Sequence, residues 1–263
     1  MKIQLLSDLH ITHAPFTPPV TDADIVVLAG DISTGADGVK WAARAFPDKP
    51  VIAVNGNHEF YGWDVNICRR AIQAAAGLTP NVRVLDGEGI TFALPGETPV
   101  RILGATLWTD FALFGKSRAS QHARQVQAAL NDYRLITFGT RRLEPRDTLE
   151  WHQKELAWLK LECTAARERG EKVVVVTHHG PSIRSSASQY LKDPVTAGFL
   201  SNLEDFCAKQ VDWFLHGHVH HSAQYSLGNC RVVVNPRGYP FSRHDPGTAF
   251  ENRVFDPALV LQI

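Results

Sequence analysis

Short runs of β-branched and aliphatic residues recur along this chain, and each run is bounded by Gly, Pro, Asn or Asp. Continuous apolar runs of this length are typical of strands that are buried on both faces. Stretches with helical patterns separate the runs, so the order of elements predicts an α/β protein. The predicted strands cover residues 2–7, 24–30, 50–56, 100–108, 172–179, 211–217 and 230–236.

Two of the intervening stretches carry clear helical signals. Residues 64–77 read DVNICRRAIQAAAG and end on Gly77. Residues 147–170 carry an apolar stripe at helical spacing, with Asp147 or Thr148 as the predicted N-cap and a glycine just past the last turn. Both stretches therefore predict helices that pack one face against a sheet.

The stretch 109–146 is more polar and irregular than its surroundings. Because the chain has no internal repeat and no low-complexity linker, we interpret this stretch as a helical insertion, or cap, within a single domain of residues 1–263. Hydrophobic residues make up 44% and charged residues 21% of the sequence, as in an ordinary soluble protein with a sizeable core.

The chain has 27 basic and 27 acidic residues, so its formal net charge is zero. That balance gives no strong signal for nucleic acid, because a sequence-independent binder needs a basic face. The four cysteines include no Cys-x-x-Cys pair, which predicts buried free thiols. The start of the chain does not resemble a signal peptide, and no apolar stretch approaches the ~20 residues that span a bilayer. We expect a cytoplasmic protein without membrane contact, and no pattern predicts its oligomeric state.

Polar side chains that can bind metal follow five of the predicted strands directly. Each motif alone is typical of a turn after a strand. Five strands that are each followed by such residues at the same position favour a common site, because open α/β sheets bind ligands at the carboxyl ends of their strands. In chain order the strand ends supply Asp8 and His10, then Asp31, then Asn57, His58 and Glu59, then His178 and His179, and finally His218 and His220.

The spacing of these residues indicates how they converge. In extended backbone, residues two apart point the same way, so Asp8 with His10 and His218 with His220 can each face one centre. A mixture of carboxylate, carboxamide and imidazole suits Mn, Fe or Zn. Seven good donors exceed the needs of one ion. They predict two metals ~3.5–4 Å apart that share a carboxylate, the arrangement of two-metal hydrolysis.

The series D-x-H, G-D, G-N-H-E, H and G-H-x-H, in this order, resembles the calcineurin-like metallophosphoesterase superfamily, and in particular its bacterial phosphodiesterases and phosphatases. The resemblance implies two packed mixed β-sheets flanked by helices, in four layers α-β-β-α, with a dinuclear site at the strand ends. It implies that Asp31 bridges two ions and that His58 faces the substrate phosphate. The implied ligands are Asp8, His10, Asp31 and His220 for one ion, and Asp31, Asn57, His178 and His218 for the other.

The same resemblance implies a metal-dependent phosphoester hydrolase in which a metal-bridging hydroxide attacks phosphorus. His58 would then stabilise a phosphoryl oxygen or protonate the leaving oxygen. The alternatives are a catalytically silent scaffold of the same fold and a nuclease acting on DNA ends. The presence of His58 argues against the scaffold, and the neutral charge argues against the nuclease.

Two departures from the family pattern narrow the function. Protein Ser/Thr phosphatases of the superfamily carry Arg where this chain has Asn55, so a phosphodiesterase or a small-molecule phosphatase is expected. Many relatives read G-D-x-x-D, and their last Asp orients the catalytic histidine, whereas this chain has Thr34. Asp37 or a carboxylate from the stretch 109–146 is the expected substitute.

Several further residues leave alternatives open. His179 is the reserve for His178, because the motif THHGP offers two histidines. The motif VNPRGYP at 234–240 resembles some bacterial members, but its polar residues could equally form a structural turn. The histidines outside the pattern are predicted to have surface or capping roles, and those beside the last motif are predicted to support the ligands or to face solvent. The first group is His13, His122, His152 and His244, and the second is His216 and His221.

Overall fold

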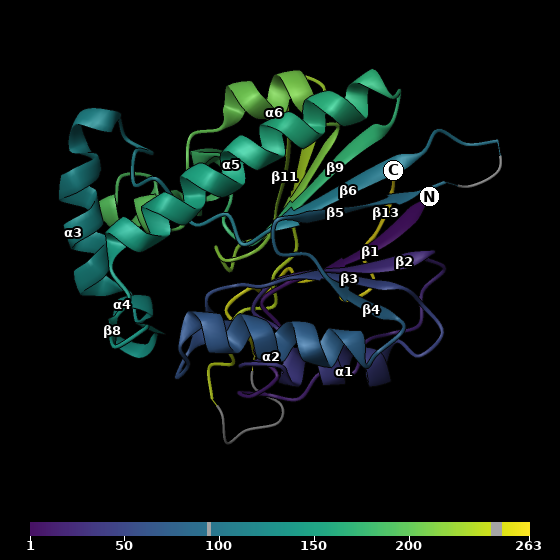
Figure 1. Cartoon of the computed structure of the whole chain (residues 1–263), viewed down its shortest axis with the longest axis horizontal. Coiled ribbons are helices and arrows are strands. Elements are labelled where there is room, and N and C mark those ends of the chain that lie inside the picture. The colour runs from purple at the N-terminus through teal and green to yellow at the C-terminus, as the bar shows by residue number, and fades with distance from the viewer. Residues whose placement is uncertain (94–95, 243–248) are drawn as a thin grey trace.

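The computed structural model describes residues 1–93, 96–242 and 249–263, and it contains two mixed β-sheets packed against each other between helices (Figure 1). The first sheet has the order β13-β1-β2-β3-β4, and the second has the order β11-β12-β10-β9-β6-β5. Strands β13, β5 and β11 pair antiparallel to their neighbours, and the other pairs are parallel. The predicted architecture of two mixed sheets is therefore confirmed.

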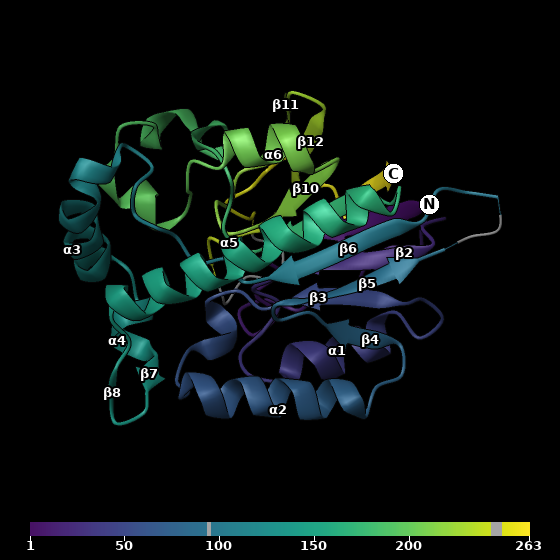
Figure 2. The same cartoon turned by 45° about the horizontal axis from the view of Figure 1, so that its top comes forward.

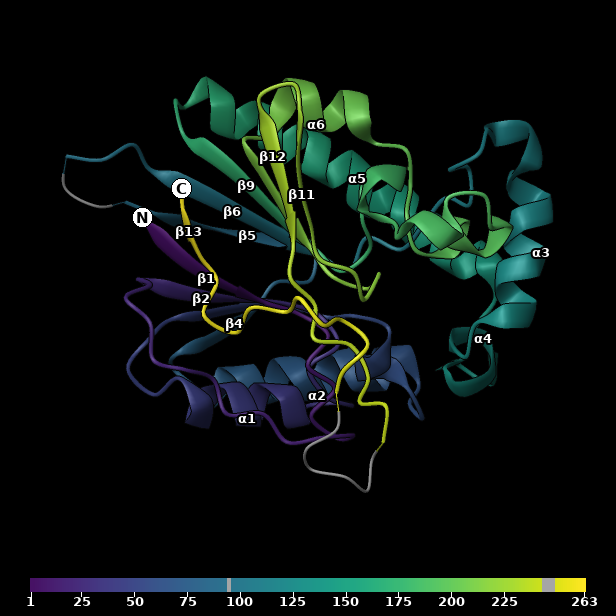
Figure 3. The same ribbon diagram turned by 180° about the vertical axis from the view of Figure 1, so that it is seen from behind.

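The strands of the first sheet are β1 (Lys2–Leu6), β2 (Ile25–Ala29), β3 (Val51–Val54), β4 (Val82–Val84) and β13 (Val260–Gln262). Those of the second are β5 (Glu88–Phe92), β6 (Val100–Ala105), β9 (Lys172–Thr177), β10 (Trp213–His216), β11 (Ala223–Leu227) and β12 (Cys230–Val234). Figure 3 shows the C-terminal strand β13 in the first sheet, whereas β11 and β12 lie in the second.

The continuous apolar runs reflect burial on both strand faces. Between the sheets, Leu5 and Val27 belong to the same buried cluster as Val174 and Leu215. On the outer faces, helices α1 (Asp37–Ala45) and α2 (Val65–Gly77) cover the first sheet, and α5 (Pro145–Glu168) and α6 (Glu204–Gln210) cover the second (Figures 1 and 2). The layers therefore follow the order α-β-β-α.

The helix at 147–170 begins earlier than predicted. Glu144 is its N-cap, and Asp147 lies in the first turn, where its Oδ2 accepts a hydrogen bond from the backbone N–H of Glu144 at 2.9 Å. The prediction of Asp147 or Thr148 as the N-cap was wrong because Pro145 already occupies the first helical position, which proline favours. For α2, Asp64 is the N-cap and accepts from the N–H of Ile67.

The stretch 109–146 is helical only in part. It contains α3 (Ala119–Ala129), α4 (Asp132–Leu135) and a small hairpin of β7 (Thr137–Phe138) and β8 (Arg141–Arg142), which the sequence did not predict. Figure 2 shows these elements together at one end of the sheets. Short 3₁₀ turns complete the fold: η1 (His58–Phe60), η2 (Lys116–Arg118), η3 (Ile183–Ser185), η4 (Ser188–Tyr190) and η5 (Pro194–Gly198).

Two predictions about isolated side chains had different outcomes. The four cysteines are buried free thiols, as predicted. His122 and His152 are 4% and 2% exposed, so the prediction of surface or capping roles for them was wrong. Their imidazoles hydrogen-bond to the backbone carbonyls of Phe111 and Trp108, which compensates their burial. His244 lies outside the described residues. In the described parts of the chain, no helix combines the length and the apolar character required to cross a bilayer.

Candidate metal centre

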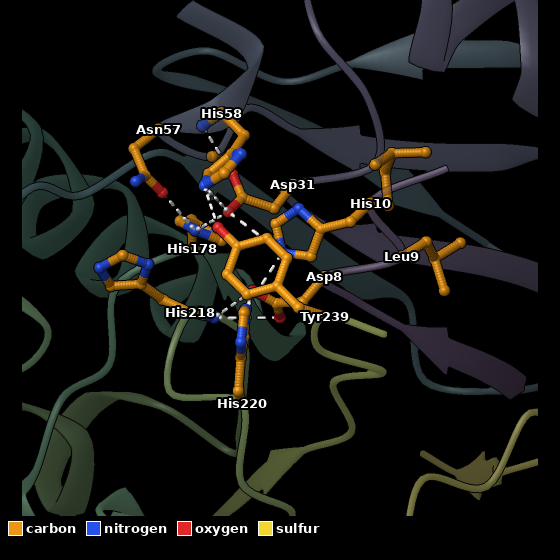
Figure 4. Close-up of polar contacts among 12 residues, drawn as sticks. Asp8, Leu9, His10, Asp31, Asn57, His58, His178, His218, His220 and Tyr239 are labelled. Carbon is orange, nitrogen blue, oxygen red and sulfur yellow. Dashed lines mark hydrogen bonds and ion pairs between the residues drawn. The ribbon is translucent and has the colours of Figure 1, made fainter. Parts of the chain in front are cut away.

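The five predicted strand ends meet at one place, where β1, β2 and β3 of one sheet and β9 and β10 of the other reach their carboxyl ends (Figure 4). Nε2 of His220 lies 3.4 Å from Oδ1 of Asp8 and 3.0 Å from Nε2 of His10. Nε2 of His178 lies 3.4 Å from Oδ2 of Asp31. Residues that are far apart in sequence thus form one cluster of metal-binding side chains.

The backbone brings these side chains together in a different way from the one predicted. Asp8 and His10 have φ of 50° and 44°, and His218 and His220 have φ of 70° and 46°. The expectation of extended backbone was therefore wrong: the strands have ended, and left-handed residues turn the side chains toward the centre. Asp31 has φ of 57° as well. Left-handed backbone conformations are unfavourable for residues with a Cβ atom, and they occur more often at functional sites than elsewhere.

The candidate ligands form three overlapping groups, of which the first two share His10 and the last two share Asp31. In each group, one ligand atom per residue lies within 4.8 Å of the ligand atoms of the others. Asn57 joins the group of Asp31, His178 and His218, because its Oδ1 lies 3.0 Å from Nε2 of His178. The groups are Asp8 with His10 and His220, Asp31 with His10 and His58, and Asp31 with His178 and His218.

Of the two neighbouring histidines, the structure brings His178 into the cluster. Its Nδ1 is 2.9 Å from the carbonyl of Ala29, which turns Nε2 toward Asp31 and Asn57. His179 instead places Nδ1 3.2 Å from the carbonyl of Thr106. The preceding glycine of the G-D motif leaves room for His178, because a Cβ atom on Gly30 would lie 2.4 Å from its Nδ1.

The charges of the cluster depend on one another. Burial acts to raise the pKa of Asp31, but the imidazoles of His178 and His58 outweigh it and hold that pKa well below its usual range. Burial likewise acts against the charged form of His178, and Asp31 overcomes it and raises the pKa of His178 to about 9. The pKa of His220 is raised to about 10, against its burial, by Asp8 and Glu251.

The donor set suits cations. Asp8 and Asp31 are 0% and 1% exposed, and among the described residues no Lys or Arg forms an ion pair with either. The positive charge that these buried carboxylates need comes from neighbouring imidazoles, whose nitrogens are also metal donors. Nε2 of His218 is buried without a hydrogen-bond partner in the same described residues. Carboxylate, carboxamide and imidazole donors of this kind fit transition metals and zinc.

A sequence profile of the calcineurin-like phosphoesterase family matches residues 1–222, which include every candidate ligand. The chain belongs to the calcineurin-like phosphoesterase family. The resemblance in the motifs is thereby confirmed, and the chain is a metal-dependent phosphoesterase. A search of curated proteins found no match.

Solved structures similar to this phosphoesterase support the fold. A phosphopantetheinyl hydrolase from Mycobacterium tuberculosis superimposes with a TM-score of 0.67 at 16% identity, over 90% of this chain and 89% of the other. A putative 5′-nucleotidase from Staphylococcus aureus gives 0.54 at 15% identity, over 89% of this chain and 48% of the other. A dimetal phosphatase from Danio rerio gives 0.50 at 16% identity, over 89% and 86%.

In this phosphoesterase the hydroxyl of a tyrosine hydrogen-bonds to the imidazole of His58. Nε2 of His58 lies 2.6 Å from the hydroxyl of Tyr239 and 3.9 Å from Oδ2 of Asp31. The expectation that Asp37 substitutes for the missing family carboxylate was wrong, because Asp37 forms a surface ion pair with Lys40. The backbone N–H of His58 donates to Oδ1 of Asp31 at 2.8 Å, which fixes the histidine beside the cluster.

The motif at 234–240 combines a structural and a local role. Asn235 donates to the carbonyls of Leu5 and Asp256, and Arg237 donates to backbone carbonyls of residues 9–15, so both stabilise the loop. Tyr239 is different: its ring stacks on that of His10 at a centroid distance of 4.3 Å and lies over the cluster (Figure 4).

Glu59, the last residue of the G-N-H-E motif, does not face the cluster. Its carboxylate accepts the backbone N–H groups of Gly56 and of residues 31–33, at 2.6 to 3.3 Å. It thereby ties the end of β2 to the end of β3. Burial, together with the charge of Asp31, raises the pKa of Glu59 to about 7.

Sequence reasoning missed two carboxylates next to the ligands. Oε2 of Glu251 lies 2.5 Å from Nδ1 of His220, a carboxylate–histidine contact of the kind that orients metal ligands. Asp132, from the stretch 109–146, accepts a hydrogen bond from Nδ2 of Asn57 at 2.8 Å. Neither belongs to a strand-end motif, so no local pattern distinguishes it from other acidic residues.

Proposed function

We propose that this phosphoesterase uses two metal ions and hydrolyses a small-molecule phosphoester, as a phosphodiesterase or a small-molecule phosphatase. The position of Asp31 carries the proposal. Its carboxylate takes part in two of the donor groups at once, on one side with His10 and on the other with His178 and His218. A carboxylate shared in this way is the bridging ligand that a two-metal site requires.

The two ions would be held by separate sets of side chains that share this bridge. When bound, Mn, Fe or Zn ions would activate a water molecule and neutralise charge on the phosphoryl oxygens. One ion would be held by Asp8, His10, Asp31 and His220, and the other by Asp31, Asn57, His178 and His218.

His58 is proposed as the residue that acts on the substrate directly. Its ring lies beside the cluster, and its Nε2 lies 3.9 Å from Oδ2 of Asp31. As an imidazolium it would donate a proton to the leaving oxygen or a hydrogen bond to a phosphoryl oxygen. The hydroxyl of Tyr239 lies 2.6 Å from the same Nε2 and would orient the ring until a substrate oxygen takes its place.

The decisive experiment compares bis-(p-nitrophenyl) phosphate with p-nitrophenyl phosphate, with Mn, Fe, Co and Zn supplied one at a time. Preference for the diester supports a phosphodiesterase, and preference for the monoester supports a phosphatase. Activity on neither, with any metal, contradicts the proposal and favours a silent scaffold. Nicking of DNA in the presence of Mn would favour the nuclease. A phosphopantetheinyl ester is a natural further probe, because one of the similar structures is a phosphopantetheinyl hydrolase.

The role of His58 has its own test. His58→Ala is expected to lower kcat by about 10²–10⁴-fold, the usual contribution of a general acid, while the protein still binds two ions. A variant with near-normal kcat and normal metal content would contradict the role. His221→Ala, next to the last motif, serves as the matched control and should leave kcat unchanged.

A further inference from the structure

Asp132 is a buried carboxylate that the stretch 109–146 carries to the metal centre. It is the first residue of α4 and is 1% exposed. Its Oδ1 accepts two hydrogen bonds, from Nδ2 of Asn57 at 2.8 Å and from the hydroxyl of Tyr61 at 2.7 Å. Within the described parts of the chain it forms no ion pair with a basic side chain. Burial of an unpaired carboxylate is costly, so these hydrogen bonds are its main compensation.

The bond from Asn57 decides which atom of the carboxamide faces the cluster. A carboxamide has one acceptor oxygen and one donor nitrogen, and only the oxygen is a metal donor. Because Nδ2 is directed at Asp132, Oδ1 points to the opposite side, where it lies 3.0 Å from Nε2 of His178. A rotation by half a turn would set two acceptor oxygens, those of Asn57 and Asp132, against each other.

The hydrogen bond from Tyr61 to Asp132 also links this carboxylate to His58, the residue proposed to face the substrate. The ring of Tyr61 packs on that of His58 at a centroid distance of 4.1 Å. Its hydroxyl also lies 3.2 Å from Nδ2 of Asn57, so all three side chains form one closed network around Oδ1 of Asp132. A single carboxylate thus orients a candidate metal ligand and the ring beneath the proposed acid.

We propose that Asp132 is a positioning residue, through which the stretch 109–146 sets the metal-binding orientation of Asn57 and the place of His58. The inference rests on the proposed two-metal function. It differs from the expectation that an acidic residue of this stretch orients His58 directly, because the carboxylate acts through Asn57 and Tyr61.

The test is a titration of the metal-free protein with Mn²⁺, by calorimetry and by metal analysis after desalting. Asp132→Ala should weaken binding of one of the two ions by about 10–100-fold, the usual effect of losing a ligand's outer partner, and should leave the other ion unaffected. Asp132→Asn keeps an acceptor oxygen and should bind both ions within about threefold of the unmodified protein. Asp110→Ala, in the same stretch, is the control and should bind as the unmodified protein does.

The outcomes separate this inference from the proposed function. If the unmodified protein binds fewer than two ions, the two-metal proposal fails. If it binds two and Asp132→Ala binds both with unchanged affinity, the positioning role is wrong. If Asp132→Ala does not fold, Asp132→Leu replaces it, since leucine has a similar shape without an acceptor. Equal losses in the Asn and Leu variants would also overturn the proposal, because a merely structural role of the charge would affect both.

Discussion

The hydroxyl of Tyr239 lies 2.6 Å from Nε2 of His58, on the side of the imidazole that faces the metal centre. The chain has Thr34 where many relatives have the carboxylate that orients this histidine. Tyr239 reaches His58 across 181 residues of sequence, and its ring is fixed by stacking on His10. We infer that this hydrogen bond orients the imidazole while no substrate oxygen occupies Nε2.

Tyr239→Phe keeps the stacked ring and removes only this hydrogen bond. One such bond contributes about 1 kcal/mol, so we expect kcat to fall about five- to tenfold while KM and metal content stay within about twofold. Steady-state kinetics with the better nitrophenyl ester measure kcat and KM, and metal analysis measures the metal content. Tyr190→Phe, an exposed tyrosine, is the control. Unchanged kcat in Tyr239→Phe would show that the hydroxyl does not orient His58.

Substituting His178 and His179 one at a time tests which of the two binds metal. His178→Ala removes a candidate ligand, so we expect the loss of one bound ion and of most activity. His179→Ala should keep both ions but should lower the free energy of unfolding by about 2 kcal/mol, because its buried ring leaves a cavity and the carbonyl of Thr106 loses a partner. Metal analysis and urea unfolding decide the matter. If His179→Ala loses an ion and His178→Ala does not, the assignment is reversed.

The bridging role of Asp31 predicts that one substitution affects both ions. Asp31→Asn removes a negative charge that both donor groups share, so binding of both ions should weaken and activity should fall by at least about 10²-fold. Asp37→Asn changes an exposed acid at the start of α1 and should leave the metal affinities and the activity unchanged. Isothermal titration with Mn²⁺ measures both affinities. Full activity in Asp31→Asn would be incompatible with a dinuclear site.

The apolar runs predicted the parallel strands except β4, because strands covered on both faces contain few polar residues, and they did not predict the antiparallel strands β5, β11 and β13. The candidate ligands could be found for a related reason: they follow those strands directly. The left-handed backbone of Asp8 and His10 was not predictable, because it depends on loops that only the packed sheets define. Asp132 and Tyr239 escaped assignment for a similar reason, since each meets its partner across more than 70 residues of sequence.

A last prediction concerns a buried acid away from the metal centre. Glu155 of α5 accepts the backbone N–H of Leu107 at 2.7 Å, and Leu107 itself has left-handed backbone. Burial raises the pKa of Glu155 to about 7, and the nearby Asp86 adds to this effect, while Arg69 opposes it. The folded protein therefore binds a proton at Glu155 at pH values where the unfolded chain, with an ordinary pKa of about 4.5, has lost it.

This difference makes stability depend on pH. Between about pH 4.5 and pH 7 the folded state holds more protons at Glu155 than the unfolded state does. The free energy of unfolding therefore falls as pH rises through this range. At roughly 1.4 kcal/mol per pKa unit, the total decrease is up to about 3 kcal/mol. Glu155→Gln keeps an acceptor for Leu107 and removes the titration. Urea unfolding of metal-free protein should show the Gln variant gaining stability relative to the unmodified protein over this range, and the gain should level off above about pH 7. Glu150→Gln, exposed on the same helix, should show no such trend. A constant difference between Glu155→Gln and the unmodified protein would mean that Glu155 is ionised in the folded state throughout.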